Sequence, residues 1–362
     1  MQDKGIDPNL EPEKLGDLEN IEFRDVREKP FRVYGVYFEE RDGIFRRLPE
    51  EVAAQVSNKV HELSERCAGG RVRFSTDADC VVLRAAFKYI FRRYAFALSG
   101  SAGFDLFVDE PESGVSHFYS LFKFEPDVVD GYTSKISFPS RKLRYITINF
   151  PTYSTLSSLE IGLPKDAKLG EGLSYKPVDP IVYYGSSITQ GCACSRPGNT
   201  YESIVCRKTN IDYLNFGFSG SAKGEPAIRD YLATLPMSAF VSDFDHNIKK
   251  ADLLREVHAP LYLAIREKHP DIPYIMLTRP DVDSMNYENV CRNRDVVMDT
   301  YRLAREQGDR NVYFIDGEGI FRGPYEDLCT VDNTHPNELG FALMADAVWS
   351  ALCRSSIRPL LD

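Results

Sequence analysis

The sequence predicts two domains of different class. We expect an antiparallel, jelly-roll-like β-sandwich over residues 1–172 and an α/β domain with a parallel five-stranded sheet over residues 173–362. First, a chain of 362 residues is long for a single hydrophobic core. Second, short runs of Val, Ile, Phe and Tyr fill its first half, whereas apolar runs alternate with helical patterns in the second. Third, residues 164–180 contain three prolines and two glycines without apolar periodicity, which is typical of a domain boundary.

The composition is that of an acidic globular protein. Apolar residues make up 43% of the chain, charged residues 27%, and the formal net charge is -10. This charge argues against nucleic acid or an anionic membrane surface as a partner. No apolar run reaches the roughly 18 residues that span a bilayer, and the polar start has no signal-peptide core. The eight cysteines are scattered, so we expect free thiols and a cytoplasmic location; a leader trimmed from the chain would instead imply secretion.

The first half reads as strands around one helix. Residues 1–30 are polar and are expected to form an extended lead-in. Residues 31–49 alternate apolar and polar side chains around an acidic turn at 39–43, which predicts a hairpin. Residues 49–65 carry aliphatic side chains at three- and four-residue spacing, which predicts one amphipathic helix. Residues 71–163 contain short β-prone runs at intervals typical of a sandwich.

The second half consists of strand patterns that are each followed by a helical pattern. The five pairs are IVYYG with YESIVCRK, IDYLNFGF with AIRDYLATL, AFVSDF with residues 250–268, YIMLTR with residues 284–307, and VYFID with residues 338–352. Such alternation predicts a parallel sheet with helices on both faces. Ligands of these sheets bind beyond the carboxyl ends of the strands, which is where we look for functional residues.

Polar and small residues collect at these strand ends. They are Ser186 and Ser187 after the first strand, Gly217, Ser219 and Gly220 after the second, Asp243, Asp245, His246 and Asn247 after the third, and Asp332 and His335 before the last helix. A serine hydroxyl becomes a nucleophile when an imidazole takes its proton, and a carboxylate orients that imidazole. The spacing Asp332-x-x-His335 lets one loop supply both groups.

An acyl-transfer site also needs hydrogen-bond donors that face the oxyanion of the tetrahedral intermediate. The candidate donors are the backbone N–H groups of Ser187 and Gly220 and the side-chain amide of Asn247. Glycine at position 220 permits a backbone conformation, or a close approach of substrate, that a β-carbon would obstruct.

Each segment also has a purely structural interpretation, as a turn or as the cap of a helix. A metal site is a further alternative, since the aspartates and histidines after the third strand and before the last helix are potential ligands. Zinc and di-metal centres draw on more histidine or cysteine than these segments contain, so we expect neither metal nor cofactor. The sequence contains no G-x-S-x-G elbow, no G-x-G-x-x-G run and no Walker A motif.

Four segments together resemble the conserved blocks of the SGNH, or GDSL-like, hydrolases. They are GSSITQG, NFGFSG, SDFDHN and DNTHPNELG, in the order of that family. The resemblance implies a three-layer, flavodoxin-like domain with Ser187 as nucleophile and Asp332 and His335 completing a triad. It also implies that Gly220 and Asn247 are oxyanion donors. In the first half, SAGFDLFVDE is similar to the Gly-x-Asp-Leu-Tyr segment of a β-sandwich domain fused to some of these hydrolases.

Two departures from the family pattern affect these assignments. Ser186 stands where the first block has aspartate, which removes no catalytic group. The third block departs from Gly-x-Asn-Asp, so His246 remains an alternative to Asn247 as oxyanion donor.

The resemblance implies a serine esterase that hydrolyses a small-acyl or carbohydrate-borne ester through an acyl-enzyme, without a cofactor. An acyltransferase would use the same triad, and a non-catalytic carbohydrate-binding protein is an alternative from another class. The expected partner is a small-molecule or glycan ester, with neither nucleic acid nor membrane. The N-terminal domain could border the crevice, bind glycans or mediate self-association as a homo-oligomer.

Overall fold

The computed structural model describes residues 7, 9–16, 18–280 and 287–361, and the chain divides into two compact units. Unit 1 comprises Met1–Arg46, Glu65–Ser174 and Arg196–Gly198, and unit 2 comprises Arg47–Ser64, Tyr175–Ser195 and Asn199–Asp362. Both units are therefore discontinuous in sequence. A division at residues 172 and 173 would assign segments 47–64 and 196–198 to the opposite units.

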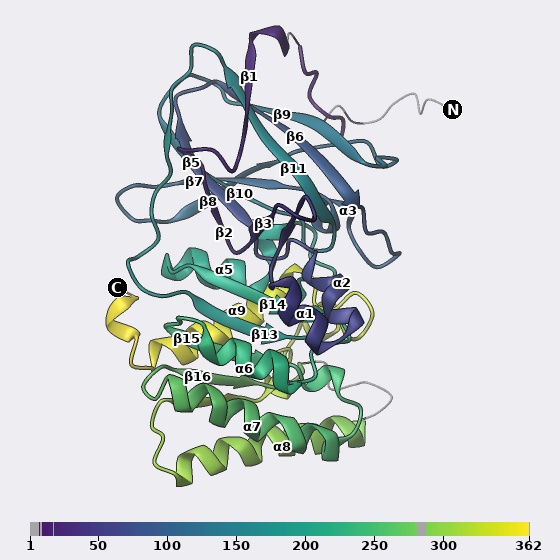
Figure 1. The fold of residues 1–362 in the computed structure, drawn as a ribbon, viewed down its shortest axis with the longest axis vertical. Coiled ribbons are helices and arrows are strands. Elements are labelled where there is room, and N and C mark those ends of the chain that lie inside the picture. The colour runs from purple at the N-terminus through teal and green to yellow at the C-terminus, as the bar shows by residue number, and fades with distance from the viewer. Residues whose placement is uncertain (1–6, 8, 17, 281–286, 362) are drawn as a thin grey trace. The chain divides into compact units, whose positions relative to one another are not determined.

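In the described part of the chain, unit 1 contains two antiparallel sheets of four and six strands, besides a separate two-stranded hairpin (Figure 1). One sheet has the order β1 (Ile21–Asp25), β11 (Thr155–Pro164), β6 (Cys80–Tyr89) and β9 (Gly131–Ser137). The other has the order β12 (Leu169–Glu171), β5 (Arg71–Thr76), β10 (Arg144–Asn149), β7 (Asp105–Asp109) and β8 (Ser116–Leu121), and β2 (Arg32–Tyr34) also pairs with β5. Apolar side chains of both sheets form one buried core, which confirms the predicted β-sandwich. A short helix, α3 (Leu98–Ser101), precedes β7.

The first 50 residues differ from the prediction in two places. β3 (Tyr37–Glu39) and β4 (Ile44–Arg46) form a hairpin around the acidic turn, but β2 pairs with β5 instead of joining that hairpin. The polar lead-in contains the short helix η1 (Leu18–Asn20) and β1, which pairs along its whole length with β11. Residues 1–6, 8 and 17 of the lead-in lie outside the described residues.

The single helix predicted over residues 49–65 is wrong. The structure has two helices, α1 (Glu50–Val56) and α2 (Asn58–Ser64), with extended backbone at Ser57 between them. The Ser57 hydroxyl accepts a hydrogen bond from the Val60 N–H at 3.2 Å, so this serine caps a new helix.

Unit 2 contains a parallel five-stranded sheet. Its order is β14 (Tyr213–Gly217), β13 (Ile181–Gly185), β15 (Ala239–Asp243), β16 (Tyr274–Leu277) and β17 (Val312–Ile315). In chain order this is 2-1-3-4-5, the flavodoxin-like arrangement, which confirms the prediction. The strand order reverses at β13, so the ligand crevice of such a sheet lies beyond Gly185.

Helices cover both faces of this sheet (Figure 1). They are α4 (Ser187–Gln190), α5 (Tyr201–Thr209), α6 (Pro226–Thr234), α7 (Ala251–Lys268), α8 (Tyr287–Glu306) and α9 (Glu338–Cys353). Successive side chains of a strand point to opposite faces of the sheet, and β13 is buried on both faces. Its side chains therefore alternate between the two hydrophobic cores of this unit. Val182 and Tyr184 pack with side chains of α6, α7 and α8. Ile181 and Tyr183 pack with side chains of α5 and α9.

The helices α1 and α2 complete the first of these cores. Leu48, Ala53, Val60 and Leu63 are buried in the same cluster as Phe216 of β14. An amphipathic pattern indicates that one face of a helix is buried, and here the partner is the sheet of unit 2.

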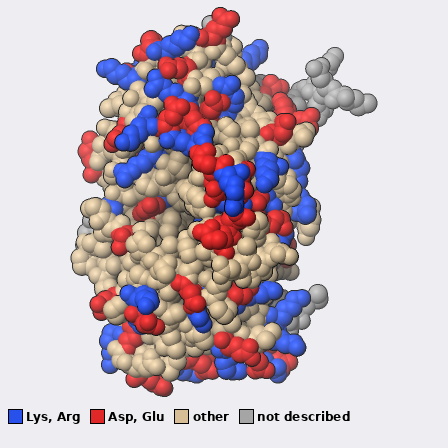
Figure 2. Space-filling view, in the orientation of Figure 1, with Lys and Arg blue, Asp and Glu red and all other residues tan. Residues whose placement is uncertain are grey.

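The surface is mixed in charge. On the face drawn in Figure 2, basic and acidic side chains are interspersed, and no extended basic surface is visible there. Among the described residues, no helix combines the length and the apolar character that crossing a bilayer requires.

Candidate active site

The first part of the site is the turn between β13 and α4. The Ser186 hydroxyl accepts from the Ile188 N–H at 3.2 Å, so Ser186 is the N-cap of the helix. A β-carbon at Gly185 would lie 2.0 Å from Thr189 Oγ1 and 2.5 Å from the Asp243 carbonyl oxygen, so only glycine fits this sharp turn. Ser187 is therefore the first residue of a helix at the carboxyl end of the central strand, and it is 8% exposed.

The second part is the loop before α9. The two ends of this loop are held by a bridge between Thr330 and Pro336. Asp332 Oδ1 accepts from the His335 N–H at 2.8 Å, and Asn333 between them has a left-handed φ of 60°. Asn337 caps α9 directly after the loop, with its side chain accepting from the Leu339 N–H at 3.0 Å.

The structure brings three predicted site residues into one hydrogen-bonded chain. His335 Nε2 lies 3.0 Å from Ser187 Oγ. His335 Nδ1 lies 2.8 Å from Asp332 Oδ2. Since the carboxylate can only accept, Nδ1 carries the proton and Nε2 is left to accept from the serine hydroxyl. Both the histidine and the aspartate side chains are about a quarter exposed, at 24% and 25%.

Electrostatics favour this protonation state. Burial alone would raise the pKa of Asp332, but the hydrogen bonds from the backbone and side chain of His335 and the backbone of Thr334 hold the pKa below its usual value. The carboxylate is therefore ionised at neutral pH, where it can orient the imidazole and stabilise an imidazolium.

The third part is the glycine-containing loop after β14. A β-carbon at Gly217 would lie 2.1 Å from the Gln190 backbone nitrogen, so this glycine lets the loop approach α4. The Ser219 N–H donates to Gln190 Oε1 at 3.0 Å, which ties the loop to the same helix. Gly220 has a φ of 67°, and apart from Gly220 and its two chain neighbours no atom of the described residues lies within 4 Å of the position of a β-carbon there, so open space borders it.

Asn247 is hydrogen-bonded to the loop after β14. It ends the short helix η3 (Asp245–Asn247) after β15. Its side-chain nitrogen donates to the Phe218 carbonyl oxygen at 3.1 Å, two residues before Gly220. The amide has a second N–H, so one group can hold the loop while the other is available to a ligand.

The remaining polar residues after β15 have structural or electrostatic partners. Asp243 is buried and accepts from Thr189 Oγ1 at 3.1 Å, under the helix that carries Ser187. Burial lowers the pKa of His246 well below its usual value, and the positive charge of Arg279 lowers it further. The imidazole of His246 is thus neutral at physiological pH.

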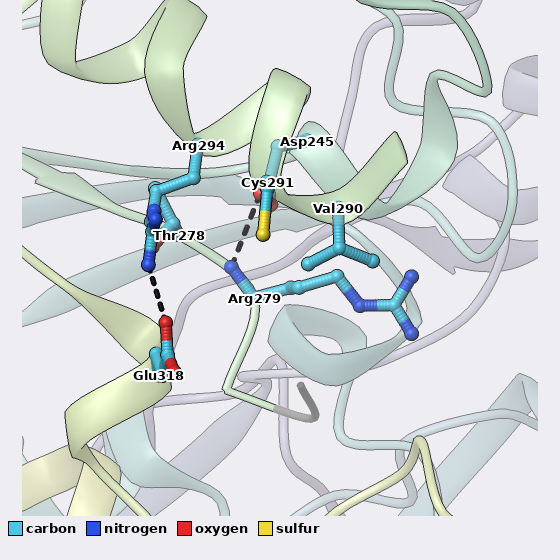
Figure 3. A pocket seen from close by; sticks show the side chains of 7 residues that line it. All are labelled: Asp245, Thr278, Arg279, Val290, Cys291, Arg294 and Glu318. Atoms are coloured by element: carbon cyan, nitrogen blue, oxygen red, sulfur yellow. Dashed lines mark hydrogen bonds and ion pairs between the residues drawn. The ribbon is translucent and has the colours of Figure 1, made fainter. Parts of the chain in front are cut away.

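Asp245 lines a small cavity at the same end of the sheet. Figure 3 shows its carboxylate beside the Arg279 backbone N–H, which donates to it at 3.1 Å, and shows Arg294 paired with Glu318. The cavity measures ≈ 10 Å³, which is about the space of one water molecule. Across the described parts of the chain, no three histidine, cysteine, aspartate or glutamate side chains form a group that could hold a metal ion.

Two supporting residues were not anticipated from the sequence. Gln190 is completely buried and holds the Ser219 N–H. Glu338 accepts from the Ser195 N–H at 2.5 Å, and it links the segment after α4 to the start of α9. Burial would raise the pKa of Glu338, but the hydrogen bonds from Ser195 hold it below its usual value. Gln190 lies in the segment GSSITQG and Glu338 in DNTHPNELG, so their positions within these motifs could have marked them as candidates for a supporting role.

Comparison with known proteins shows which families the two halves of the chain resemble. Residues 178–353 match the GDSL-like lipase/acylhydrolase family, and residues 21–169 match the N-terminus of SGNH-hydrolase-type esterases. No curated protein matches the sequence.

Three solved structures share the fold. The first, from Bacteroides ovatus ATCC 8483 and provisionally assigned as a GDSL-like lipase, has 26% identity and a TM-score of 0.81, covering 92% of this chain and 98% of its own. The salicylyl-acyltransferase SsfX3 of a tetracycline biosynthetic pathway has 20% identity and a TM-score of 0.75, with coverages of 92% and 97%. A family two carbohydrate esterase from Clostridium thermocellum, solved with cellohexaose, has 15% identity and a TM-score of 0.59, with coverages of 80% and 93%.

The matched ranges account for both halves of the chain, in the order that the sequence motifs predicted. Residues 178–353 therefore belong to the GDSL-like lipase/acylhydrolase family, the N-terminal region of SGNH-type esterases precedes them, and together these matches support a serine ester hydrolase.

Proposed function

We propose that this protein hydrolyses a small-acyl or carbohydrate-borne ester through an acyl-enzyme on Ser187. The observation that carries the proposal is the hydrogen-bonded chain from Ser187 Oγ through His335 to Asp332, with separations of 3.0 and 2.8 Å. This chain contains the three groups that a catalytic triad requires. The serine can act as nucleophile, the imidazole as general base, and the ionised carboxylate as the group that orients the imidazole.

In acylation, Ser187 Oγ attacks the ester carbonyl carbon while His335 Nε2 takes the hydroxyl proton. The resulting oxyanion is stabilised by the Ser187 and Gly220 backbone N–H groups and by the Asn247 side chain. Collapse of the tetrahedral intermediate expels the alcohol, which receives the proton from the imidazolium. A water molecule then attacks the acyl-enzyme with His335 again as base, which releases the acid and restores the serine.

The substrate class is proposed from the fold. The carbohydrate esterase from Clostridium thermocellum combines a related fold with a bound cello-oligosaccharide. The site of this protein leaves open space beside Gly220, so the carbonyl group can approach the loop closely. The bound oligosaccharide of that esterase structure favours an ester whose alcohol is a sugar or a similar polyol, and we propose a small acyl group for it.

The proposal is tested by hydrolysis of p-nitrophenyl acetate and of acetylated cello-oligosaccharides. Ser187→Ala and His335→Ala should each reduce kcat by several orders of magnitude, since the members of such a triad act as a unit. Ser186→Ala is the matched control, because Ser186 caps the helix and its hydroxyl bonds to a backbone N–H. Retention of wild-type turnover by Ser187→Ala would contradict the mechanism.

The identity of the side-chain oxyanion donor is tested separately. Asn247→Ala should lower kcat by about 10²- to 10³-fold if the amide faces the oxyanion. If His246→Gln has the larger effect and Asn247→Ala a small one, the donor is the neighbouring imidazole.

Acyl transfer to an alcohol is the second candidate function. SsfX3, an acyltransferase, matches 92% of this chain with a TM-score of 0.75, which makes transfer the specific alternative to hydrolysis. The two reactions share every step up to the acyl-enzyme and differ in the nucleophile that releases it. Partitioning of the acyl group between water and added sugar alcohols distinguishes them: a hydrolase yields mainly free acid, whereas a transferase yields mainly the new ester.

A further inference from the structure

Arg47 is a buried arginine in unit 2 whose position in the sequence gives no hint of its role. It is 4% exposed and starts the segment that contains α1 and α2. Its Nη1 donates to the carbonyl oxygens of Asn215 and Gly217, each at 2.9 Å. Its Nη2 donates to the Leu63 carbonyl oxygen at 2.8 Å. The guanidinium carbon lies 5.0 Å from the centre of the Phe218 ring.

The acceptors of Arg47 lie on the open side of an edge strand. β14 is the first strand in the order of its sheet and pairs only with β13 among the described strands. An edge strand leaves backbone groups without a neighbouring strand, and these need other partners when they are buried. The guanidinium supplies several donors in a fixed planar arrangement, which suits two carbonyl groups two residues apart. Arg47 thus closes the edge of the sheet at its carboxyl end.

The residues held by Arg47 lead directly into the loop that carries Gly220. Asn215 Oδ1 accepts from the Gly217 N–H at 2.9 Å, and Asn215 Nδ2 donates to the Thr189 carbonyl oxygen of α4 at 2.5 Å. The Phe218 N–H donates to the Gly185 carbonyl oxygen at 2.8 Å. The same turn is therefore fixed on one side by the elements that carry Ser187 and on the other side by Arg47.

The carbonyl group of Phe218 then connects this turn to the second candidate donor. It accepts from Asn247 Nδ2 at 3.1 Å and from the Ser221 N–H at 2.8 Å. A shift of Phe218 would therefore displace the backbone around Gly220 and the Asn247 amide together.

We propose that Arg47 is a positioning residue for the oxyanion site: it fixes the carboxyl end of β14 and thereby the orientation of the Gly220 and Asn247 donors. This inference rests on the proposed esterase function. Arg47 lies outside residues 178–353, which match the hydrolase family, and inside residues 21–169, which match the N-terminal region. The hydrolase unit therefore depends on a side chain that the chain supplies 140 residues before Ser187.

The test compares full-length Arg47→Met and Arg47→Lys with substitutions at Arg266, a half-buried arginine of the same unit. Arg266 in unit 2 also donates to backbone carbonyl oxygens, at 2.9 Å to His269 and 2.7 Å to Ile272, but near the start of β16. Arg266→Met therefore removes hydrogen bonds to backbone carbonyl groups at the opposite end of the sheet, and it also removes the ion pair of Arg266 with Asp309 at 2.8 Å. The measurements are Tm and the separate values of kcat and KM for p-nitrophenyl acetate, at a temperature where every variant is folded.

We expect both methionine variants to lower Tm. Only Arg47→Met should lower kcat, by about 10- to 100-fold, because oxyanion donors act in the transition state, whereas KM should change little. Arg47→Lys keeps the charge but lacks the planar fork, so a smaller loss of kcat is expected. The apparent pKa in the pH profile of kcat/KM should stay at the wild-type value, because the His335–Asp332 pair is untouched. If Arg47→Met does not fold, the comparison of Arg47→Lys with Arg266→Lys decides by the same criteria.

Wild-type kcat in the Arg47 variants would overturn the inference while leaving the esterase function intact. An equal loss of kcat in the Arg47 and Arg266 variants would overturn it too, because activity would then follow stability. A wild-type protein without Ser187-dependent ester hydrolysis would overturn both the function and the inference.

Discussion

Asp105 Oδ2 accepts a hydrogen bond from the Gly198 N–H at 2.8 Å, and both residues belong to unit 1. Asp105 is completely buried and is the aspartate of the GFDLF segment. Its carboxylate also accepts from Asn149 Nδ2 at 2.8 Å and pairs with Arg196 at 3.2 Å. A β-carbon at Gly198 would lie 2.7 Å from Asp105 Oδ2 and 2.6 Å from the Phe107 ring. The motif aspartate thus binds a chain segment, residues 196–198, that lies within the range matched by the hydrolase family.

Asp105→Ala should therefore destabilise the protein strongly. The substitution leaves three donors, one of them a guanidinium, without their buried acceptor, and we expect a loss of about 3 to 5 kcal/mol in the free energy of unfolding. Urea denaturation followed by circular dichroism measures this loss. Asp166→Ala is the control, because Asp166 pairs with Arg141 on the surface and its side chain is 68% exposed. Equal shifts of the urea midpoint in the two variants would contradict a structural role for Asp105.

Asp332→Asn should abolish most activity without unfolding the loop. Asparagine can still accept from the His335 backbone N–H, which Asp332 Oδ1 now does at 2.8 Å. Its amide nitrogen would face His335 Nδ1, however, so the ring would carry its proton on Nε2 and could not take the serine proton. We expect kcat for p-nitrophenyl acetate to fall by about 10²- to 10⁴-fold with little change in Tm. An active Asp332→Asn enzyme would show that the carboxylate does not set the tautomer.

The two glycines of the loop after β14 should respond differently to alanine. At Gly217 the new methyl group would meet the Gln190 backbone at 2.1 Å, so Gly217→Ala should disrupt the packing of α4 and lower Tm markedly. At Gly220 the methyl group would meet no atom of the described residues within 4 Å beyond its chain neighbours, and the left-handed φ of 67° should cost about 1 to 2 kcal/mol. The open space beside Gly220 is where we propose that the substrate oxygen binds.

Gly220→Ala should accordingly lose far more activity than its change in Tm explains. Thermal unfolding and ester hydrolysis measured on the same preparations provide the comparison. A fully active Gly220→Ala protein would place the oxyanion elsewhere.

The α/β architecture could be predicted because its strands are short, apolar on both faces and regularly followed by helices. The residues IVYYG, for example, supply Ile181 and Tyr183 to one core and Val182 and Tyr184 to the other. Ser187 and His335 are 148 residues apart in the sequence, but both were predicted to lie in one site. Ligands of open parallel sheets bind beyond the carboxyl ends of the strands, and both residues were expected at that edge.

Other features depend on contacts that no local pattern encodes. The periodicity of residues 49–65 indicated a buried helical face but neither the break at Ser57 nor the sheet against which α1 and α2 pack. Arginine is most often exposed in proteins, so nothing in the sequence marked Arg47 as buried against an edge strand. The same applies to segment 196–198, which belongs to unit 1 although its neighbours in the chain belong to unit 2.

The last prediction concerns acid stability and depends on a buried histidine of α7. His258 of α7 is 2% exposed, its Nδ1 lies 2.9 Å from Thr300 Oγ1, and its ring stacks on Phe244. Burial lowers its pKa to about 3, so the native state keeps this ring neutral while the unfolded chain protonates it below about pH 6.5.

A group whose pKa is lower in the folded state makes the unfolded state bind more protons, so stability falls as the pH falls. Between pH 7 and pH 5 this linkage should remove about 2 kcal/mol from the free energy of unfolding. His258→Gln cannot titrate in this range, so its stability should decline by that much less than that of the wild type. Urea denaturation at several pH values measures the two slopes. Parallel declines would show that His258 takes up a proton in the native state and that its burial does not drive acid unfolding.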